Sequence, residues 1–185
     1  MLKVFINPGH DMDLDPGACA NGLREVDIAL AIGQQVKQIM EGIGYPCQII
    51  QSDNLNGETE NKPNVCGTAN TSGADVFVSI HCNSAANTSA KGTETLVYST
   101  GGKAELLAKC IQSQIVNSLS TVDRGIKERP DLCVLRETIM PAILVETAFI
   151  SNEEDAYKLQ FRQYAFAAAI SRGITDYEKS IYTIY

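Results

Sequence analysis

Histidine is scarce in this sequence, which contains only two among its 185 residues. Runs of basic residues are absent as well, and the net charge of −7 argues against nucleic acid as a partner, because that binding normally needs clustered Lys and Arg. The sequence also has neither the features of a secretory signal nor an apolar stretch long enough to cross a bilayer. We therefore expect synthesis in the cytoplasm and no membrane partner.

Pairs of cysteines with C-x-x-C spacing are missing too. The six cysteines lie at positions 19, 47, 66, 82, 110 and 133, mostly inside expected helices or strands, which indicates reduced structural thiols. Internal repeats, low-complexity segments and linkers are also lacking. Together with a hydrophobic content of 44%, this predicts one compact domain with a substantial core.

Strand-like apolar runs alternate with long helical segments. Strands are expected at 2–6, 46–51, 76–80, 93–98, 132–135 and 142–147. Helices are expected at 24–43, 61–72 and 102–119, and a last helix or pair of helices at 153–177. Gly44 is expected to follow the first long helix in a left-handed conformation, and Ser151 or Asn152 to cap the last helical region. The alternation predicts an α/β fold with a mostly parallel, twisted sheet and helices on both faces.

Three of the expected strands are followed by chemically active side chains. His10 comes shortly after "VFIN", His81 directly after "FVSI", and Glu146 at the end of "PAILVE". Because the carboxyl ends of parallel strands share one edge of a sheet, these groups are expected to lie there together. Each group alone also fits a structural role, as a histidine with satisfied hydrogen bonds or a carboxylate that reaches solvent.

Glu25 joins these groups through helical periodicity. With Ala29, Ile32 and Val36 it follows the i, i+4, i+7, i+11 stripe, which places it on the inward face of the first helical turn. A buried carboxylate should be paired or bound to a metal, because an isolated buried charge is costly. The alternative is an acid at a helix start that points partly to water and is stabilised by the helix dipole.

Two histidines and a carboxylate form the ligand set of a catalytic zinc site. We therefore expect His10, Glu25 and His81 to bind Zn²⁺, and Glu146 to act as general acid and base.

The acidic segment "DMDLDPG" does not fit an EF-hand calcium loop, because Pro16 occupies the place of the required glycine.

Four segments then indicate a family. "INPGHD", "LREVDIALAIGQQV", "ADVFVSIHCN" and "PAILVETAFISNEED" resemble, in order, the motifs of zinc-dependent N-acetylmuramoyl-L-alanine amidases of the amidase-3 type. The resemblance extends from Leu2 to about Gly173 and implies a six-stranded α/β fold. It also implies hydrolysis of the amide between N-acetylmuramic acid and the L-alanine of the peptidoglycan stem peptide. The residues that it assigns are the same: His10, Glu25 and His81 as metal ligands and Glu146 as catalytic acid/base.

The resemblance leads to further expectations. Residues 1–175 are expected to form the catalytic domain of an endolysin or autolysin, and residues 176–185 a C-terminal extension or the start of a linker. Such a domain would be monomeric, act on the cell wall after release by lysis or a holin, and depend on a wall-binding module in the full-length chain. Two alternatives stay open: another zinc peptidase of the cell wall, or an inactive wall-binding module of the same fold. A carboxypeptidase would favour arginines clustered near the site, and the sequence indicates none.

Overall fold

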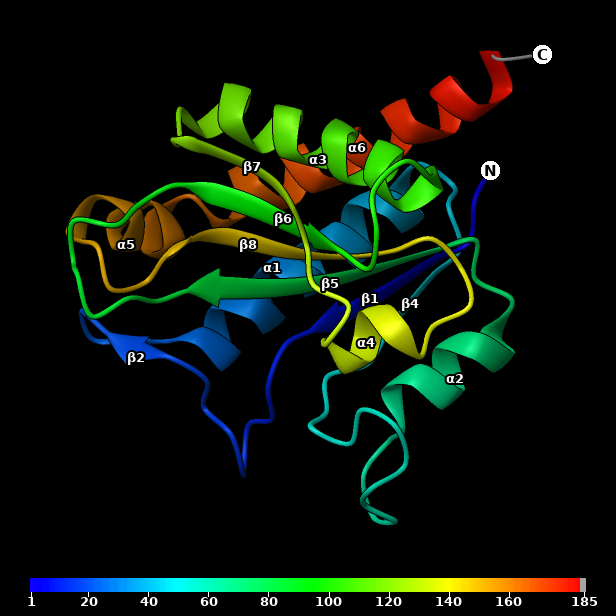
Figure 1. Ribbon diagram of the computed structural model, residues 1–185, viewed down its shortest axis with the longest axis horizontal. Helices are drawn as coiled ribbons and strands as arrows, with labels where there is room; N and C mark the ends of the chain where they lie inside the picture. The colour runs from blue at the N-terminus through cyan, green and yellow to red at the C-terminus, as the bar shows by residue number, and fades with distance from the viewer. Residues whose placement is uncertain (184–185) are drawn as a thin grey trace.

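The computed structural model describes residues 1–183. A six-stranded sheet forms the centre of the fold (Figure 1). Its strand order is β4-β1-β5-β8-β6-β7. The strands are β1 (Val4–Pro8), β4 (Cys47–Ile49), β5 (Val76–Asn83), β6 (Thr93–Val97), β7 (Asp123–Glu128) and β8 (Ala142–Phe149). Between neighbouring strands of this described sheet, only the β6–β8 pairing is antiparallel. The prediction of an α/β domain with a mostly parallel six-stranded sheet is confirmed.

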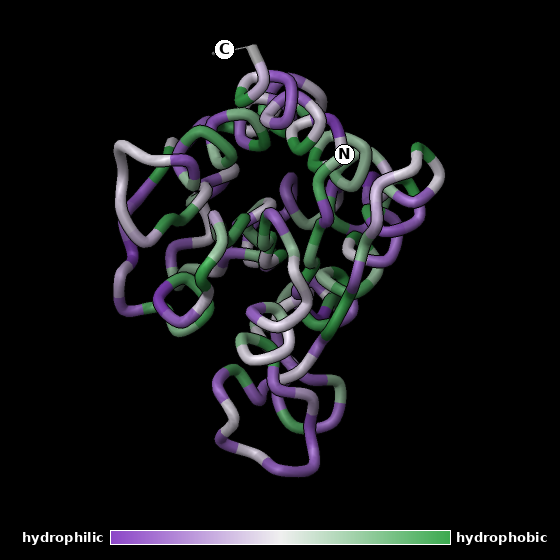
Figure 2. Tube along the Cα trace, turned by 90° about the vertical axis from the view of Figure 1, so that its right-hand side faces the viewer, coloured by the Kyte–Doolittle hydropathy of each residue, from purple (hydrophilic) through white to green (hydrophobic). Residues whose placement is uncertain are grey.

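Two hydrophobic cores flank the sheet, because successive side chains of a strand point to opposite faces. The larger core joins Val4 and Ile6 of β1 to three long helices, α1 (Glu25–Gly42), α3 (Lys103–Leu119) and α6 (Gln163–Thr183). The smaller core joins Phe5 to the short helices α2 (Val65–Ser72) and α4 (Cys133–Arg136). Figure 2 shows hydrophobic stretches in the interior and a largely hydrophilic loop, between β4 and α2, at the bottom of the view.

The remaining elements lie at the ends of the sheet. A short antiparallel hairpin, β2 (Cys19–Ala20) and β3 (Leu23–Arg24), comes directly before α1, and α5 (Glu153–Phe161) follows β8. The Asn152 side chain caps α5 by accepting a hydrogen bond from the backbone N–H of Asp155 at 3.1 Å. Gly44 has φ 90° just after α1. Both local predictions are confirmed.

Two differences from the expected elements affect the candidate site. Strand β7 was not expected, because Asp123–Glu128 is a polar, largely exposed segment with little of the apolar pattern of a strand. Its edge position in the sheet explains this composition, since an edge strand faces solvent along one side. The strand expected at 132–135 is instead helix α4, since a short apolar run has the same composition in a buried strand or a buried helical turn.

Helix α6 continues across the expected boundary between residues 175 and 176, and Tyr177 within it is buried. Residues 184–185, at the end of the expected extension, lie outside the described residues. The division into a catalytic domain and an extension therefore stays a prediction. In the described part of the chain, the helices are too short or too polar to cross a membrane, and all six cysteines are free thiols.

Candidate metal centre

Three side chains of the expected ligand set converge at the edge of the sheet. Nε2 of His10 and Nδ1 of His81 each lie 3.0 Å from Oε1 of Glu25. The two imidazole rings meet edge to face, with centroids 4.9 Å apart and planes inclined by 71°. One candidate ligand atom from each residue lies within 4.8 Å of the others. The structure thus brings together the three residues that the sequence indicated as ligands.

Each of these side chains is placed by a different element. His81 lies on β5, Glu25 is the first residue of α1, and His10 occupies the turn after β1 with a left-handed φ of 69°. Such a φ is uncommon for a residue with a side chain, although histidine is among those that adopt it more often. The parallel strands β1 and β5 are neighbours, so this turn delivers His10 to the same end of the sheet as His81.

Two glycines leave room for the imidazole rings. A Cβ atom on Gly9 would lie 2.2 Å from Cε1 of His81, and one on Gly17 would lie 2.6 Å from Cδ2 of His10. Both distances are far below van der Waals contact. These two positions therefore need glycine for the rings to occupy their observed places.

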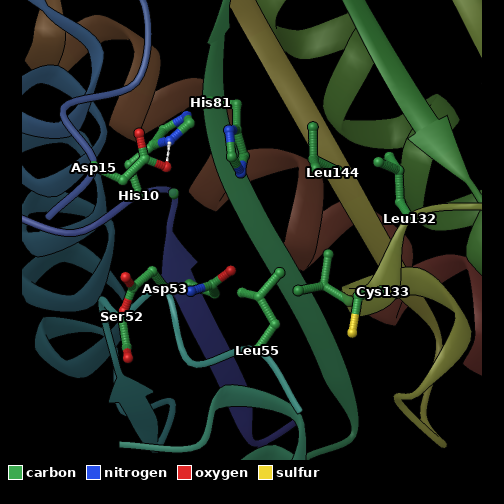
Figure 3. A pocket seen from close by; sticks show the side chains of 12 residues that line it. His10, Asp15, Ser52, Asp53, Leu55, His81, Leu132, Cys133 and Leu144 are labelled. Atoms are coloured by element: carbon green, nitrogen blue, oxygen red, sulfur yellow. Dashed lines mark hydrogen bonds and ion pairs between the residues drawn. The ribbon is translucent and has the colours of Figure 1, made fainter. Parts of the chain in front are cut away.

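Hydrogen bonds hold the ligand set in position (Figure 3). Oδ2 of Asp15 contacts Nδ1 of His10 at 2.7 Å, and this leaves Nε2 directed toward Glu25. The Glu25 carboxylate accepts hydrogen bonds from the backbone N–H groups of Ala18 and Cys82, both at 2.9 Å. A carboxylate on the second nitrogen of a ligand histidine fixes its tautomer and ring orientation. The sequence did not identify this role for Asp15, which appeared only within the acidic segment "DMDLDPG".

The electrostatics of the cluster favour a cation. Burial would lower the pKa of His10, but its hydrogen bonds to Glu25 and Asp15 outweigh this effect and raise the pKa to about 9. Burial would likewise raise the pKa of Glu25, which the hydrogen bonds with both histidines instead bring well below its ordinary value. Two imidazole nitrogens and a buried, ionised carboxylate are a donor set that suits Zn²⁺. The residues present therefore fit the metal that the sequence suggested.

Glu146 lies beside this cluster and has different surroundings. It is the cross-strand partner of His81 between β5 and β8, so both side chains project from the same face of the sheet. Its Oε2 is buried and has no hydrogen-bond partner among the described residues. Burial raises the pKa of Glu146 to about 7. A carboxyl group with this pKa and a free oxygen is suited to accept and release a proton near neutral pH.

A cavity of about 200 Å³ opens next to the two histidines. Figure 3 shows the imidazole rings at one side of this cavity and the apolar side chains of Leu55, Leu132 and Leu144 across from them. Asp53 also lines the cavity, and its buried Oδ1 has no hydrogen-bond partner within residues 1–183. The space beside the candidate ligands therefore has an apolar wall and an unpartnered acceptor on Asp53, neither of which the sequence revealed.

Three cationic side chains, those of Arg124, Lys127 and Arg129, lie on or just after β7, where the sequence had indicated no cluster of arginines. Arg124 and Lys127 contact Glu94, which is the cross-strand partner of Glu146. The pKa of Arg129 is raised, first by its hydrogen bond to Asp131 and more weakly by the charges of Glu146 and Glu94. The sequence could not place these residues, because β7 was not recognised as a strand beside β6.

This fold and site define the class of protein as an α/β protein with a candidate metal centre beside a buried carboxyl oxygen. The family described as N-acetylmuramoyl-L-alanine amidase, Amidase_3, matches residues 4–176. The uncharacterized protein YqiI of Bacillus subtilis (strain 168) is 41% identical over 94% of this chain and 84% of its own length. The amidase LytC of the same organism is 35% identical over 94% of this chain, which spans 35% of LytC.

A solved structure supports the same relationship. The amidase AmiC2 of Nostoc punctiforme superposes with a TM-score of 0.84 and 34% sequence identity, covering 96% of this chain and 97% of that one. The chain belongs to the N-acetylmuramoyl-L-alanine amidase family of the amidase-3 type. It is accordingly an enzyme that hydrolyses peptidoglycan.

Proposed function

We propose that this chain hydrolyses the amide between the lactyl group of N-acetylmuramic acid and the L-alanine of the stem peptide, with zinc held by His10, Glu25 and His81. The observation that carries the proposal is the convergence of His10 Nε2 and His81 Nδ1 on one Glu25 oxygen, beside Glu146, whose buried Oε2 has no partner within residues 1–183. When bound there, zinc supplies a Lewis acid for the scissile carbonyl and lowers the pKa of the attacking water.

Glu146 moves the proton in this reaction. As a base, it takes a proton from water while the water oxygen forms a bond to the carbonyl carbon. It then gives that proton to the alanine nitrogen as the carbon–nitrogen bond breaks. The second proton of the water stays on the new carboxyl group until that group ionises. The products are then a lactyl carboxylate on the sugar and a free amino group on the peptide. A pKa raised by burial to about 7 suits a group that must both accept and release a proton.

Two further residues position this machinery. Asp15 holds the His10 ring through Nδ1, so that Nε2 stays available on the side of Glu25. The backbone N–H of Cys82 donates to Glu25 and ties this carboxylate to β5.

The apolar wall formed by Leu55, Leu132 and Leu144 keeps water away from one side of the cavity, which strengthens electrostatic interactions inside it.

The bond that is cut tests the proposal. Purified peptidoglycan is digested with zinc-loaded protein, and the new chain ends are identified by mass spectrometry. We expect free amino-terminal L-alanine on released stem peptides and intact glycan strands. New reducing sugar ends, or cleavage only between amino acids, would exclude this amidase reaction and favour another wall hydrolase. Intact peptidoglycan after digestion would favour an inactive wall-binding module.

A further inference from the structure

A row of charged side chains extends from the candidate metal centre toward β7. His81 on β5 pairs in register with Glu146 on β8, and Glu146 pairs with Glu94 on β6. Leu96, two residues after Glu94, belongs to the core on the same face of the sheet and pairs in register with Lys127 on β7. Because side chains alternate along each strand, all these groups project from the face that carries the candidate site.

Glu94 is the buried anchor at the outer end of this row. Its Oε2 accepts hydrogen bonds from Nε of Arg124 at 2.8 Å and from Nζ of Lys127 at 2.5 Å. Its Oε1 accepts one from Nδ2 of Asn83 at 2.9 Å. The Arg124 guanidinium also lies over the Phe149 ring, 4.8 Å from its centroid. The two cationic groups are therefore held in place by a carboxylate, an aromatic ring and the edge of the sheet.

Arg124 and Lys127, here called the cationic pair, carry one positive charge more than Glu94 neutralises. The exposed fraction of the side chain is 33% for Arg124 and 44% for Lys127, against 10% for Glu94. The negative charge is thus covered and both positive groups reach solvent. Arg129 adds little to this excess, because its guanidinium makes two hydrogen bonds to Asp131. In a chain with a net charge of −7, this local excess is suited to an anionic ligand.

The proposed chemistry determines which part of the substrate lies there. Glu146 gives its proton to the alanine nitrogen, so the peptide begins beside Glu146. Neighbouring strands are about 4.8 Å apart, so β7 lies about 10 Å beyond β8 across β6. An extended peptide advances about 3.3 Å per residue. The side chains of Arg124 and Lys127 extend from β7 toward Glu94 on β6 and so shorten the remaining distance. A stem peptide that runs from Glu146 across β6 toward β7 would therefore bring its second residue within reach of the cationic pair.

We propose that the cationic pair binds a free carboxylate on the second residue of the stem peptide, and so selects substrates that carry this charge. The inference rests on the proposed amidase function and adds a specificity-determining subsite to it. Glu94 is a positioning residue in this arrangement, since it orients both cationic groups without contacting the substrate.

Two soluble muramyl peptides that differ in one group test this inference. In one the second residue has a free carboxylate, and in the other the same carboxyl is a carboxamide. Rates of hydrolysis give kcat/KM for each substrate with zinc-loaded protein. We expect wild type to prefer the carboxylate substrate by about tenfold or more, as one charge-assisted hydrogen bond would produce. In Lys127→Gln and in Arg124→Gln this ratio should fall toward one, and in Lys127→Arg it should persist.

Lys109→Gln is the matched control, because Lys109 is an exposed lysine on α3 that pairs with Glu105 outside the site. This variant should keep the wild-type ratio. Circular dichroism and thermal unfolding establish whether each variant is folded. Because Lys127→Gln and Arg124→Gln remove charge independently, the test stays decisive if one of them does not fold. Two results would overturn the inference and leave the proposed function intact. One is equal kcat/KM for the two substrates in wild type, and the other is an unchanged ratio in a folded charge-removing variant. Failure of wild type to cut the lactyl–alanine amide of either substrate would overturn the proposed function, and the inference with it.

Discussion

Glu25 and Glu146 both have at least partly buried carboxyl groups beside His81, yet their surroundings suit them to different chemical roles. Glu25 accepts two backbone hydrogen bonds and contacts both histidines. Burial would raise its pKa, but the hydrogen bonds with His10 and His81 bring the pKa well below its ordinary value. Glu146 has a buried oxygen without a partner in the part of the chain that the structure describes, and burial raises its pKa to about 7. A carboxylate that stays ionised suits a metal ligand, and one that titrates near neutral pH suits a proton carrier.

Replacing Glu146 by glutamine separates these two roles. Glu146→Gln has nearly the same shape and should fold and bind zinc like wild type, because Glu146 is not in the ligand set. Its rate of peptidoglycan hydrolysis should fall at least about a hundredfold, since a positioned acid and base is lost. Glu153→Gln, an exposed change at the start of α5, is the control and should keep the wild-type rate. A Glu146→Gln protein that retained most of its activity would assign the proton transfer to another residue.

The His81 ring is the second residue-scale test. We expect purified wild type to contain about one zinc per chain by metal analysis, and His81→Ala to bind zinc at least about tenfold more weakly. Ser84→Ala, which changes an exposed residue just after β5, should retain full zinc content. Unchanged zinc affinity in His81→Ala would remove His81 from the ligand set.

At the scale of elements, the site depends on how closely β1 and β5 bring their ends together. Gly9, just after β1, lies so near His81 that an added Cβ would be 2.2 Å from a ring atom. The His81 ring would have to move, because the backbone after β1 is held by a hydrogen bond from the Gly9 N–H to the Ile80 carbonyl at 2.9 Å. The glycine therefore sets the distance at which two ligand-bearing elements can meet.

Gly9→Ala should weaken zinc binding about tenfold or more while the sheet still forms, because a displaced ligand ring cannot keep its coordination geometry. Zinc titration of the metal-free protein measures this loss, and circular dichroism reports the fold. Gly42→Ala at the end of α1 is the matched control, since an added Cβ there meets no atom within 4 Å. Equal zinc affinity in wild type and Gly9→Ala would show that the ring can shift without affecting the site.

Element patterns also explain how far the sequence could predict this site. The apolar runs of β1, β5 and β8 and the helical stripe through Glu25 are strong signals, and they were sufficient to bring His10, Glu25 and His81 to one edge. The contact between Asp15 and His10 depends on a turn with an unusual φ, which residue type alone does not specify. The cationic pair could not be placed, because β7 is a polar edge strand whose pairing with β6 arises only in the folded sheet.

At the scale of the whole molecule, charge limits how the enzyme meets its substrate. The chain carries a net charge of −7, and the cationic pair is a local exception beside the site. Long-range attraction to an anionic cell wall is therefore absent, and contacts at the site must supply the affinity. Linking a catalytic domain to a second binding unit can raise avidity by about a hundredfold or more without new contacts at the site. This is the reason to expect a wall-binding module as a partner of this domain.

Sedimentation with intact cell walls tests that expectation. Zinc-loaded Glu146→Gln is mixed with walls at physiological salt, so that the substrate persists, and the protein in pellet and supernatant is measured. We expect most of the 185-residue chain to stay in the supernatant. Raising the ionic strength should not reduce the small pelleted fraction, because salt screens the repulsion between an acidic protein and an anionic wall. Fusion to a wall-binding domain, as the positive control, should move the protein into the pellet. Tight, saturable retention of the chain alone would contradict the expectation, since the site would then hold the polymer without a second binding unit.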